Sequence, residues 1–208
     1  MSHVNLGSTR RSLHGVAELV LAGPQYAASR SIRLRATPGG FGTTAAPDLR
    51  VQGAHLVTPD RRLPLEGSYA DLARAAGVEA RTLRDVYDVG PGVAEDELID
   101  VDPDAAELLH GAFARGDAAM RSFAPDAEPV IWPEHFDIGI SVHETNYGVS
   151  PGDSYLDEPY AYVGPWSPRT GDFWNAPFGA ARPLGELPDA ESLTRFFQEG
   201  ARQAGTEP

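Results

Sequence analysis

The stretch WPEHFDIGISVHETNYGVSPGDSYLDEPYAYVGPW, which runs from Trp132 to Trp166, decides the fold. Apolar and polar residues alternate through its first part, turn-forming residues fill its middle, and alternation returns in YAYVGPW. A period of two that is broken by turn residues is typical of β-strands with one apolar and one polar face. The stretch therefore predicts successive strands of a sheet that has one buried and one wet side.

The rest of the chain contains both helical and strand periodicities. The predicted elements are, in order, a helix over 10–22 ended by Gly23-Pro24, a strand over 31–37, a strand pair across 49–65, a helix from Ser68 to Gly77, a strand over 82–87, a helix over 102–124, one or two strands in 172–184 and a closing helix from 188. Strands and helices occur in clusters and do not alternate regularly. This order indicates an α+β fold on a mainly antiparallel sheet with three or four packed helices.

The helix over 102–124 has the clearest signals. Asp102 is the expected N-cap and Pro103 the first helical residue. Its predicted buried stripe consists of Leu108, Leu109, Ala112 and Phe113. The closing helix is expected to bury Leu193, Phe196 and Phe197.

A length of 208 residues fits a single domain over 1–208, or two lobes. The segment DVGPGVAEDELID, residues 88–100, is acidic and contains glycine and proline. Such a composition is typical of an exposed loop. We therefore expect any weak boundary between two lobes near residues 90–100.

Two residue types are absent and exclude whole classes of chemistry. The chain has no Cys, which excludes thiol nucleophiles, disulfides, iron–sulfur clusters and thiolate zinc sites. It also has no Lys, because all seventeen basic residues are Arg. Lysine-anchored pyridoxal phosphate and P-loop nucleotide binding are therefore excluded, and the sequence names no other cofactor.

A formal net charge of −13 argues against nucleic acid as a partner, because affinity for nucleic acid comes largely from neutralising phosphates. The apolar run over 16–22 is short and contains Glu18, so it is not typical of a secretion signal. No run approaches the roughly 20 apolar residues that span a bilayer. We therefore expect a soluble, cytoplasmic protein without a membrane partner, and a homo-oligomer stays open.

The candidate chemistry lies on the first strand of the quoted stretch. If the strand begins near Glu134, its apolar side holds Phe136, Ile138, Ile140 and Val142, and its other side holds His135, Asp137, Gly139, Ser141 and His143. Neighbours on one side lie about 6.6 Å apart, so His135 and Asp137 could touch. Such a pair suits a general base with its orienting acid, or two ligands of a metal ion. His143 would lie roughly 26 Å from His135, too far to share a metal.

Aromatic residues gather in the same region. Ten of the eighteen aromatic residues, including all three Trp, lie between Trp132 and Phe178. Tyr and Trp suit the walls of a pocket as well as a core. The candidate ligand-binding residues are Trp132, Asn146, Tyr160, Tyr162, Trp166 and Trp174. At least two of the three Trp are expected to border one concave site that reaches His135 or Asp137.

Three functional hypotheses follow. The first is a small-molecule pocket walled by these aromatics, with polar contacts from His135, Asp137 and Asn146. The second is an enzyme, a metal-dependent or general acid/base hydrolase or isomerase, that uses His135 and Asp137. The third is a subunit interface, where Tyr and Trp are also enriched. His14, His55 and His110 lie singly in helix-like or strand-like runs and are expected to be packing or surface residues.

Several motifs resemble those of a family of uncharacterised proteins encoded mainly by actinobacteria. They are WPEHFDIGI, NYGVSPGD, EPYAYVGPW and FWNAPFGAARPL, with LHGVAELVLAGPQY and IRLRATPGGFG upstream. The carboxy-terminal half is also loosely similar to a broader bacterial family of unknown function. The resemblance implies a bacterial, cytoplasmic protein, and it implies no activity or site residue.

Overall fold

The computed structural model describes residues 5–205. The chain forms two compact units: the first comprises the residues up to Gly111 together with 131–136, and the second comprises 112–130 with the residues from Asp137 onward. The expected weak boundary near 90–100 does not separate these units, because residues 88–100 belong wholly to the first. The division falls instead within the long helix α4 (Pro103–Phe123) and on either side of 131–136.

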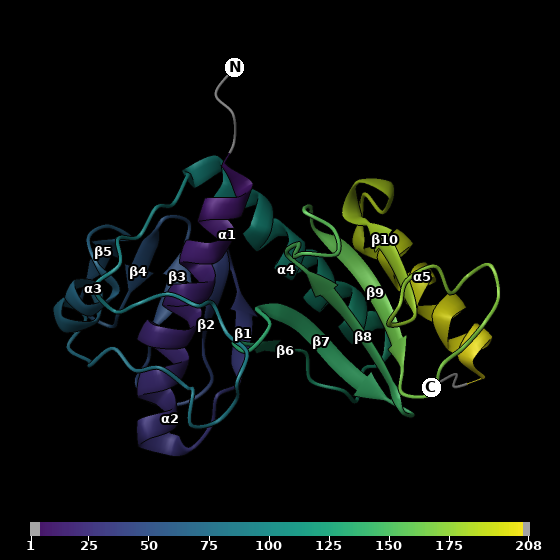
Figure 1. The fold of residues 1–208 in the computed structure, drawn as a ribbon, viewed down its shortest axis with the longest axis horizontal. Coiled ribbons are helices and arrows are strands. Elements are labelled where there is room, and N and C mark those ends of the chain that lie inside the picture. Colours follow the sequence, from purple (N-terminus) through teal and green to yellow (C-terminus); the bar gives the residue numbers. More distant parts are fainter. Residues whose placement is uncertain (1–4, 206–208) are drawn as a thin grey trace. The chain divides into compact units, whose positions relative to one another are not determined.

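The first unit combines a long helical run with an antiparallel sheet (Figure 1). Its elements are α1 (Leu6–Gly15), η1 (Val16–Ala22), α2 (Gly23–Ser29), β1 (Leu34–Thr37), β2 (Gly40–Thr43), β3 (Arg50–Gln52), β4 (His55–Val57), β5 (Arg62–Pro64), α3 (Tyr69–Ala75), the first part of α4 and β6 (Val130–Trp132). The strand order is β6-β1-β2-β3-β4-β5. Leu34 faces Ile131, and Phe41 faces Val51, so the register places apolar side chains opposite one another.

The first helix does not end at Gly23-Pro24, so that prediction was wrong. The helix passes through a π-helical segment, η1, and continues to Ser29. In the π register residue 24 would donate to the carbonyl of Leu19, but proline has no N–H. The backbone N–H of Arg81 supplies the missing hydrogen bond at 2.9 Å. A Cβ at Gly23 would lie 2.1 Å from the Arg81 carbonyl, so glycine allows this close approach.

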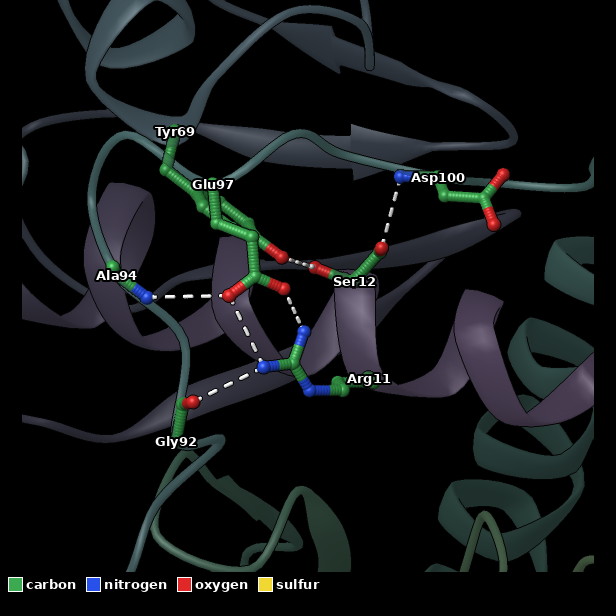
Figure 2. Close-up of polar contacts among 7 residues, drawn as sticks. All are labelled: Arg11, Ser12, Tyr69, Gly92, Ala94, Glu97 and Asp100. Atoms are coloured by element: carbon green, nitrogen blue, oxygen red, sulfur yellow. Dashed lines mark hydrogen bonds and ion pairs between the residues drawn. The ribbon is translucent and has the colours of Figure 1, made fainter.

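Residues 81–102 lie alongside the helical run 6–29 and are bonded to it through polar groups. Figure 2 shows Arg11 paired with Glu97, while its guanidinium also donates to the Gly92 carbonyl at 3.1 Å. Ser12 accepts from the Asp100 N–H at 3.0 Å. The predicted strand over 82–87 is absent from this segment, which forms a turn because the N–H groups of Val86 and Tyr87 both bond the Leu83 carbonyl.

The helix caps follow the sequence. Ser68 caps α3 by accepting from the Asp71 N–H, and Gly77 lies beyond the helix with φ +81°. Asp102 caps α4 by accepting from the N–H groups of Asp104 and Ala105. These predicted boundaries are confirmed.

The predicted buried stripe of α4 is confirmed at three of its four positions. Leu109, Ala112 and Phe113 are buried, but Leu108 is 48 % exposed. The buried alanines Ala105, Ala106 and Ala119 and the buried Met120 extend this face along the helix. The stripe is therefore narrower than the run of apolar letters indicates.

The second unit is a four-stranded antiparallel sheet with helices on one face (Figure 1). Its elements are the later part of α4, β7 (Asp137–Val142), β8 (Thr145–Ser150), β9 (Tyr160–Pro165), β10 (Ala180–Pro183), the 3-10 turn η2 (Leu184–Glu186) and α5 (Ala190–Ala204). The strand order is β10-β9-β8-β7, with Gly139 facing Gly148 and Gly148 facing Tyr162.

Close helix packing defines the inner face of this sheet. A Cβ at Gly116 of α4 would lie 3.0 Å from Ile138 and from Val149, and one at Gly200 of α5 would lie 2.7 Å from Val163. The predicted burial of Leu193, Phe196 and Phe197 is confirmed. Residues of the opposite parity lie on the other side, which we call the open face. Its positions on β7, β8 and β9 are Asp137, Gly139, Ser141, Asn146, Gly148, Ser150, Tyr160, Tyr162 and Gly164.

The fold class expected from the sequence is confirmed. The strand pairs are antiparallel, and the helical run 6–29 with α3, α4 and α5 makes four packed helices among residues 5–205. In that described part of the chain, no helix combines the length and the apolar character needed to cross a membrane.

Candidate functional site

The predicted site residues fall in both units. Trp132 and His135 belong to the first unit. The second unit contains Asp137, Asn146, Tyr160, Tyr162, Trp166 and Trp174. The division between Phe136 and Asp137 thus separates the two members of the predicted catalytic pair.

His135 lies in a turn and not on a strand. The strand expected to start near Glu134 begins at Asp137, so its predicted start was wrong. Phe136 adopts a left-handed φ of +56° and donates its N–H to the Trp132 carbonyl at 2.7 Å, which closes the turn. Its buried ring stacks on His14 at 5.3 Å and fixes this strained conformation. His135 is exposed and lies 3.6 Å from Glu134.

Trp132 is 37 % exposed at the end of β6. Trp174 is half-buried and packs edge-on against Phe173 at 4.9 Å, and the Phe173 ring contacts Phe196 of α5 at 5.6 Å. Trp174 thus belongs with the aromatics of α5, whereas Trp166 adjoins the open face. Within the second unit the two Trp have different neighbours.

Asp137 and Tyr162 are joined across the middle of the open face. Tyr162 of β9 reaches over Gly148 of β8 and Gly139 of β7, and its hydroxyl donates to the Asp137 carboxylate. A Cβ at Gly148 would lie 2.4 Å from the Tyr162 hydroxyl oxygen, so the tyrosine occupies the space that the glycines leave. Burial and the Asp137 charge raise the pKa of Tyr162, which keeps its hydroxyl protonated as a donor.

Tyr160 anchors one end of the open face. Its hydroxyl donates to Asp153 at 2.7 Å, and Asp153 also accepts from the N–H of Tyr155 at 2.8 Å. Burial, followed by the hydrogen bond to Asp153, raises the pKa of Tyr160. The Phe178 ring contacts Tyr155, Tyr160 and Tyr162 at 5.0, 6.3 and 6.4 Å. These four aromatics form a continuous cluster.

Trp166 and Asn146 occupy the other end. The Trp166 indole N–H donates to Asn146 Oδ1 at 3.2 Å, and the Ser141 hydroxyl donates to the same oxygen at 2.7 Å. All three residues are exposed, and Trp166 is 64 % exposed. Asn146 is therefore held by two partners although it faces solvent.

Three residues near the open face are not among the ligand-binding residues predicted from the sequence: Ser141, Tyr155 and Phe178. Ser141 was assigned to the polar side of the strand, so its alternation was the signal that could have selected it. Tyr155 and Phe178 lie outside the strands, and only the fold brings their rings to Tyr160. No local pattern marks them.

A second cluster surrounds Glu18 in the first unit. Glu18 is 5 % exposed in the π-helical segment, and it accepts from the Tyr87 hydroxyl at 2.9 Å and from the Leu83 N–H at 3.4 Å. Burial raises its pKa. Both partners belong to residues 81–102, so the carboxyl attaches that segment to the helix. The sequence signal for this cluster is Glu18 itself, an acidic residue within the apolar run VAELVLA.

Within residues 5–205, no group of three or more His, Asp or Glu side chains is arranged to hold a metal ion. Comparisons of the chain with protein-family models, with curated proteins and with solved structures gave no match. The likeness to an actinobacterial family stays a prediction.

Proposed function

We propose that the second unit binds a small molecule on its open face. The observation that carries this proposal is the position of the exposed aromatics. Among the described residues of this unit, the exposed large apolar side chains are Tyr155, Trp166 and Phe178. Two of them join the cluster around Tyr160, and Trp166 bonds Asn146, so all three adjoin the open face.

Exposed aromatic surface is unfavourable unless something covers it, and clustered exposure marks interaction sites. Polar groups with fixed partners lie between the rings: the exposed Asn146 and Ser141 at one end, and the part-buried Asp137–Tyr162 pair in the middle. Apolar surface with a few oriented polar groups is the pattern of small-molecule sites. This proposal retains four of the six predicted binding residues, Asn146, Tyr160, Tyr162 and Trp166, and uses neither Trp132 nor Trp174.

The enzyme alternative has less support. Its argument required His135 and Asp137 on one side of a strand, but His135 lies in the preceding turn beside Glu134. Within the second unit the Asp137 carboxylate accepts from the Tyr162 hydroxyl. A hydrolase or isomerase that uses this pair stays a hypothesis without a geometric basis in either unit.

A fragment library screened by saturation-transfer NMR tests the proposal. We expect fragments that bind the wild-type protein to lose their signal with Trp166→Ala and with Phe178→Ala. Leu98→Ala is the matched control, because Leu98 is 71 % exposed in the first unit. Hits that persist in both aromatic variants would refute the proposal. Self-association that is lost in Trp166→Ala, without any hit, would favour a subunit interface instead.

A further inference from the structure

Ser141, Asn146 and Trp166 form a row in which the hydrogen bonds fix which groups donate and which accept. An indole N–H can only donate, so the oxygen of the Asn146 amide must face Trp166. Ser141 uses its one proton toward the same oxygen, at 2.7 Å. The amide nitrogen of Asn146 therefore keeps both N–H donors for an external acceptor, and the Ser141 oxygen keeps lone pairs for an external donor.

The position beside Asn146 is also open. Gly164 of β9 faces Asn146 in the register and has no side chain. A Cβ there would lie 3.4 Å from the Phe178 carbonyl and 3.9 Å from Asn146, so the site tolerates one added methyl group. Trp166 lies two residues further along the chain, just past the end of β9, with most of its surface exposed. The Trp166 ring, the Asn146 amide donors and the Ser141 oxygen therefore border the position at Gly164, which has no side chain.

The row carries no formal charge. Among the open-face positions of the fully described strands β7, β8 and β9, the charged residue is Asp137, which accepts from Tyr162. A charged ligand would find no opposite charge in the row of Ser141, Asn146 and Trp166. A neutral ligand that has hydroxyl groups and one apolar face matches it better.

We propose that this row binds a pyranose ring of a neutral saccharide. A pyranose has C–H faces that stack on an indole, and its neighbouring hydroxyls can accept from the Asn146 amide while donating to Ser141. This inference rests on the proposed function, because it names the class of ligand for one end of the same open face.

The test uses the full chain and the methyl glycosides of glucose, galactose, mannose and N-acetylglucosamine as probes. Titrations are followed by the indole N–H signals in ¹H–¹⁵N spectra, and Trp166→Phe assigns its signal. We expect at least one glycoside to shift the Trp166 signal, and Asn146→Ala to weaken that binding at least about tenfold. Gly164→Ala should also weaken glycoside binding, because the added methyl group would occupy the space above Gly164. Leu98→Ala, an exposed position that is not among the binding candidates, should leave the affinity unchanged.

Three results separate the two proposals. Glycoside binding that Asn146→Ala leaves unaffected would overturn the saccharide inference. Binding of flat aromatic fragments at Trp166, with no response to any glycoside, would also overturn it but would keep the proposed function. No response to fragments or to glycosides would overturn both. Unchanged denaturation midpoints of the Asn146 and Gly164 variants exclude misfolding as the cause.

Discussion

In the first unit a row of polar side chains is buried along the helical run 6–29, whereas in the second unit a row of polar side chains is exposed at one end of the open face. The buried polar residues of that run are Thr9, Ser12, Glu18 and Gln25. Each bonds the backbone of a segment outside the helix. Ser141, Asn146 and Trp166 of the second unit instead bond one another at the surface.

This difference separates polar groups that stabilise the fold from polar groups that remain available to a ligand. A buried polar group that is fully partnered by loop backbone determines where the loop runs, and it has no capacity left for a ligand. A polar group held at the surface keeps donors or acceptors for something else. The comparison therefore directs the search for function to the second unit, although the buried carboxyl group of Glu18 and the π-helical segment of the first unit are more unusual.

Among substitutions of polar residues, the largest effect is expected from Gln25 in the first unit. Its side chain donates to the carbonyls of Ser31 and Arg33, both at 2.9 Å, and accepts from the N–H groups of Thr44 and Ala45 at 2.7 and 2.8 Å. Gln25→Ala removes these four hydrogen bonds to backbone groups, and also a longer one from the Thr44 hydroxyl, and should lower the free energy of unfolding by about 4 kcal/mol, at roughly 1 kcal/mol for each backbone bond. Chemical denaturation measures this loss.

Gln203→Ala provides the matched control, because Gln203 bonds only the exposed Glu199 in the part of the chain that the structure describes. Its unfolding free energy should change by less than about 0.5 kcal/mol. Equal losses in the two variants would contradict the structural role assigned to Gln25.

Much of the secondary structure could be predicted because its causes are local. Ser68, Asp102 and Asp189 cap the helices that follow them, since a capping side chain bonds N–H groups two or three residues away. The alternation of β7 and β9 identified the two sides of the sheet. These signals depend on neighbours in sequence.

What the sequence did not predict depends on contacts between residues far apart in the chain, or on backbone conformation that no local pattern marks. Gly23-Pro24 reads as a helix end because the sequence cannot show that Arg81 donates to the Leu19 carbonyl. Asp137 could be assigned to a polar side, but its partner Tyr162 lies two strands away and is reached across two glycines. The sequence alternation places His135 on the strand because nothing local indicates a left-handed φ at Phe136.

The next effect concerns pH and two residues one helical turn apart, His14 and Glu18. Burial lowers the pKa of His14 to about 4 from 6.5. The folded state therefore resists protonation, and the stability that His14 contributes above pH 6.5 is lost as the pH falls toward 4. His14→Gln should remove about 3 kcal/mol of this acid dependence. Denaturation curves at pH 7 and pH 4 measure it.

Glu18 should act with the opposite sign. Burial raises its pKa above 4.5, so the folded state binds the proton more tightly than the unfolded state. The stability of the wild type relative to Glu18→Gln should therefore fall as the pH rises above 4.5. Arg84 and Tyr87 face this carboxyl and are kept in both proteins. A rise with pH would show that Glu18 is stabilised as an ion.

A smaller effect is expected at the middle of the open face. Gly148→Ala would place a Cβ 2.6 Å from the Ile138 carbonyl and 2.4 Å from the Tyr162 hydroxyl. Overpacking of this kind costs about 2 kcal/mol and should displace Tyr162 from Asp137. Gly185→Ala is the control, because a Cβ there has no neighbour within 4 Å. If both variants unfold at the wild-type denaturant concentration, the tyrosine does not lie over the glycines as described.

The smallest effect on stability, and the sharpest test of the comparison, is expected from Trp166. Its side chain is 64 % exposed and its hydrogen bond to Asn146 lies at the surface, so Trp166→Ala should change the unfolding free energy by no more than about 0.5 kcal/mol. Phe197→Ala in the buried core of the same unit should cost about 3 to 5 kcal/mol. A large side chain whose removal costs almost no stability does not serve folding, and the loss of fragment binding in the same variant would assign it to ligand recognition. If Trp166→Ala destabilises the protein as much as Phe197→Ala, Trp166 is part of the core, and the division into structural polarity in the first unit and functional surface in the second fails.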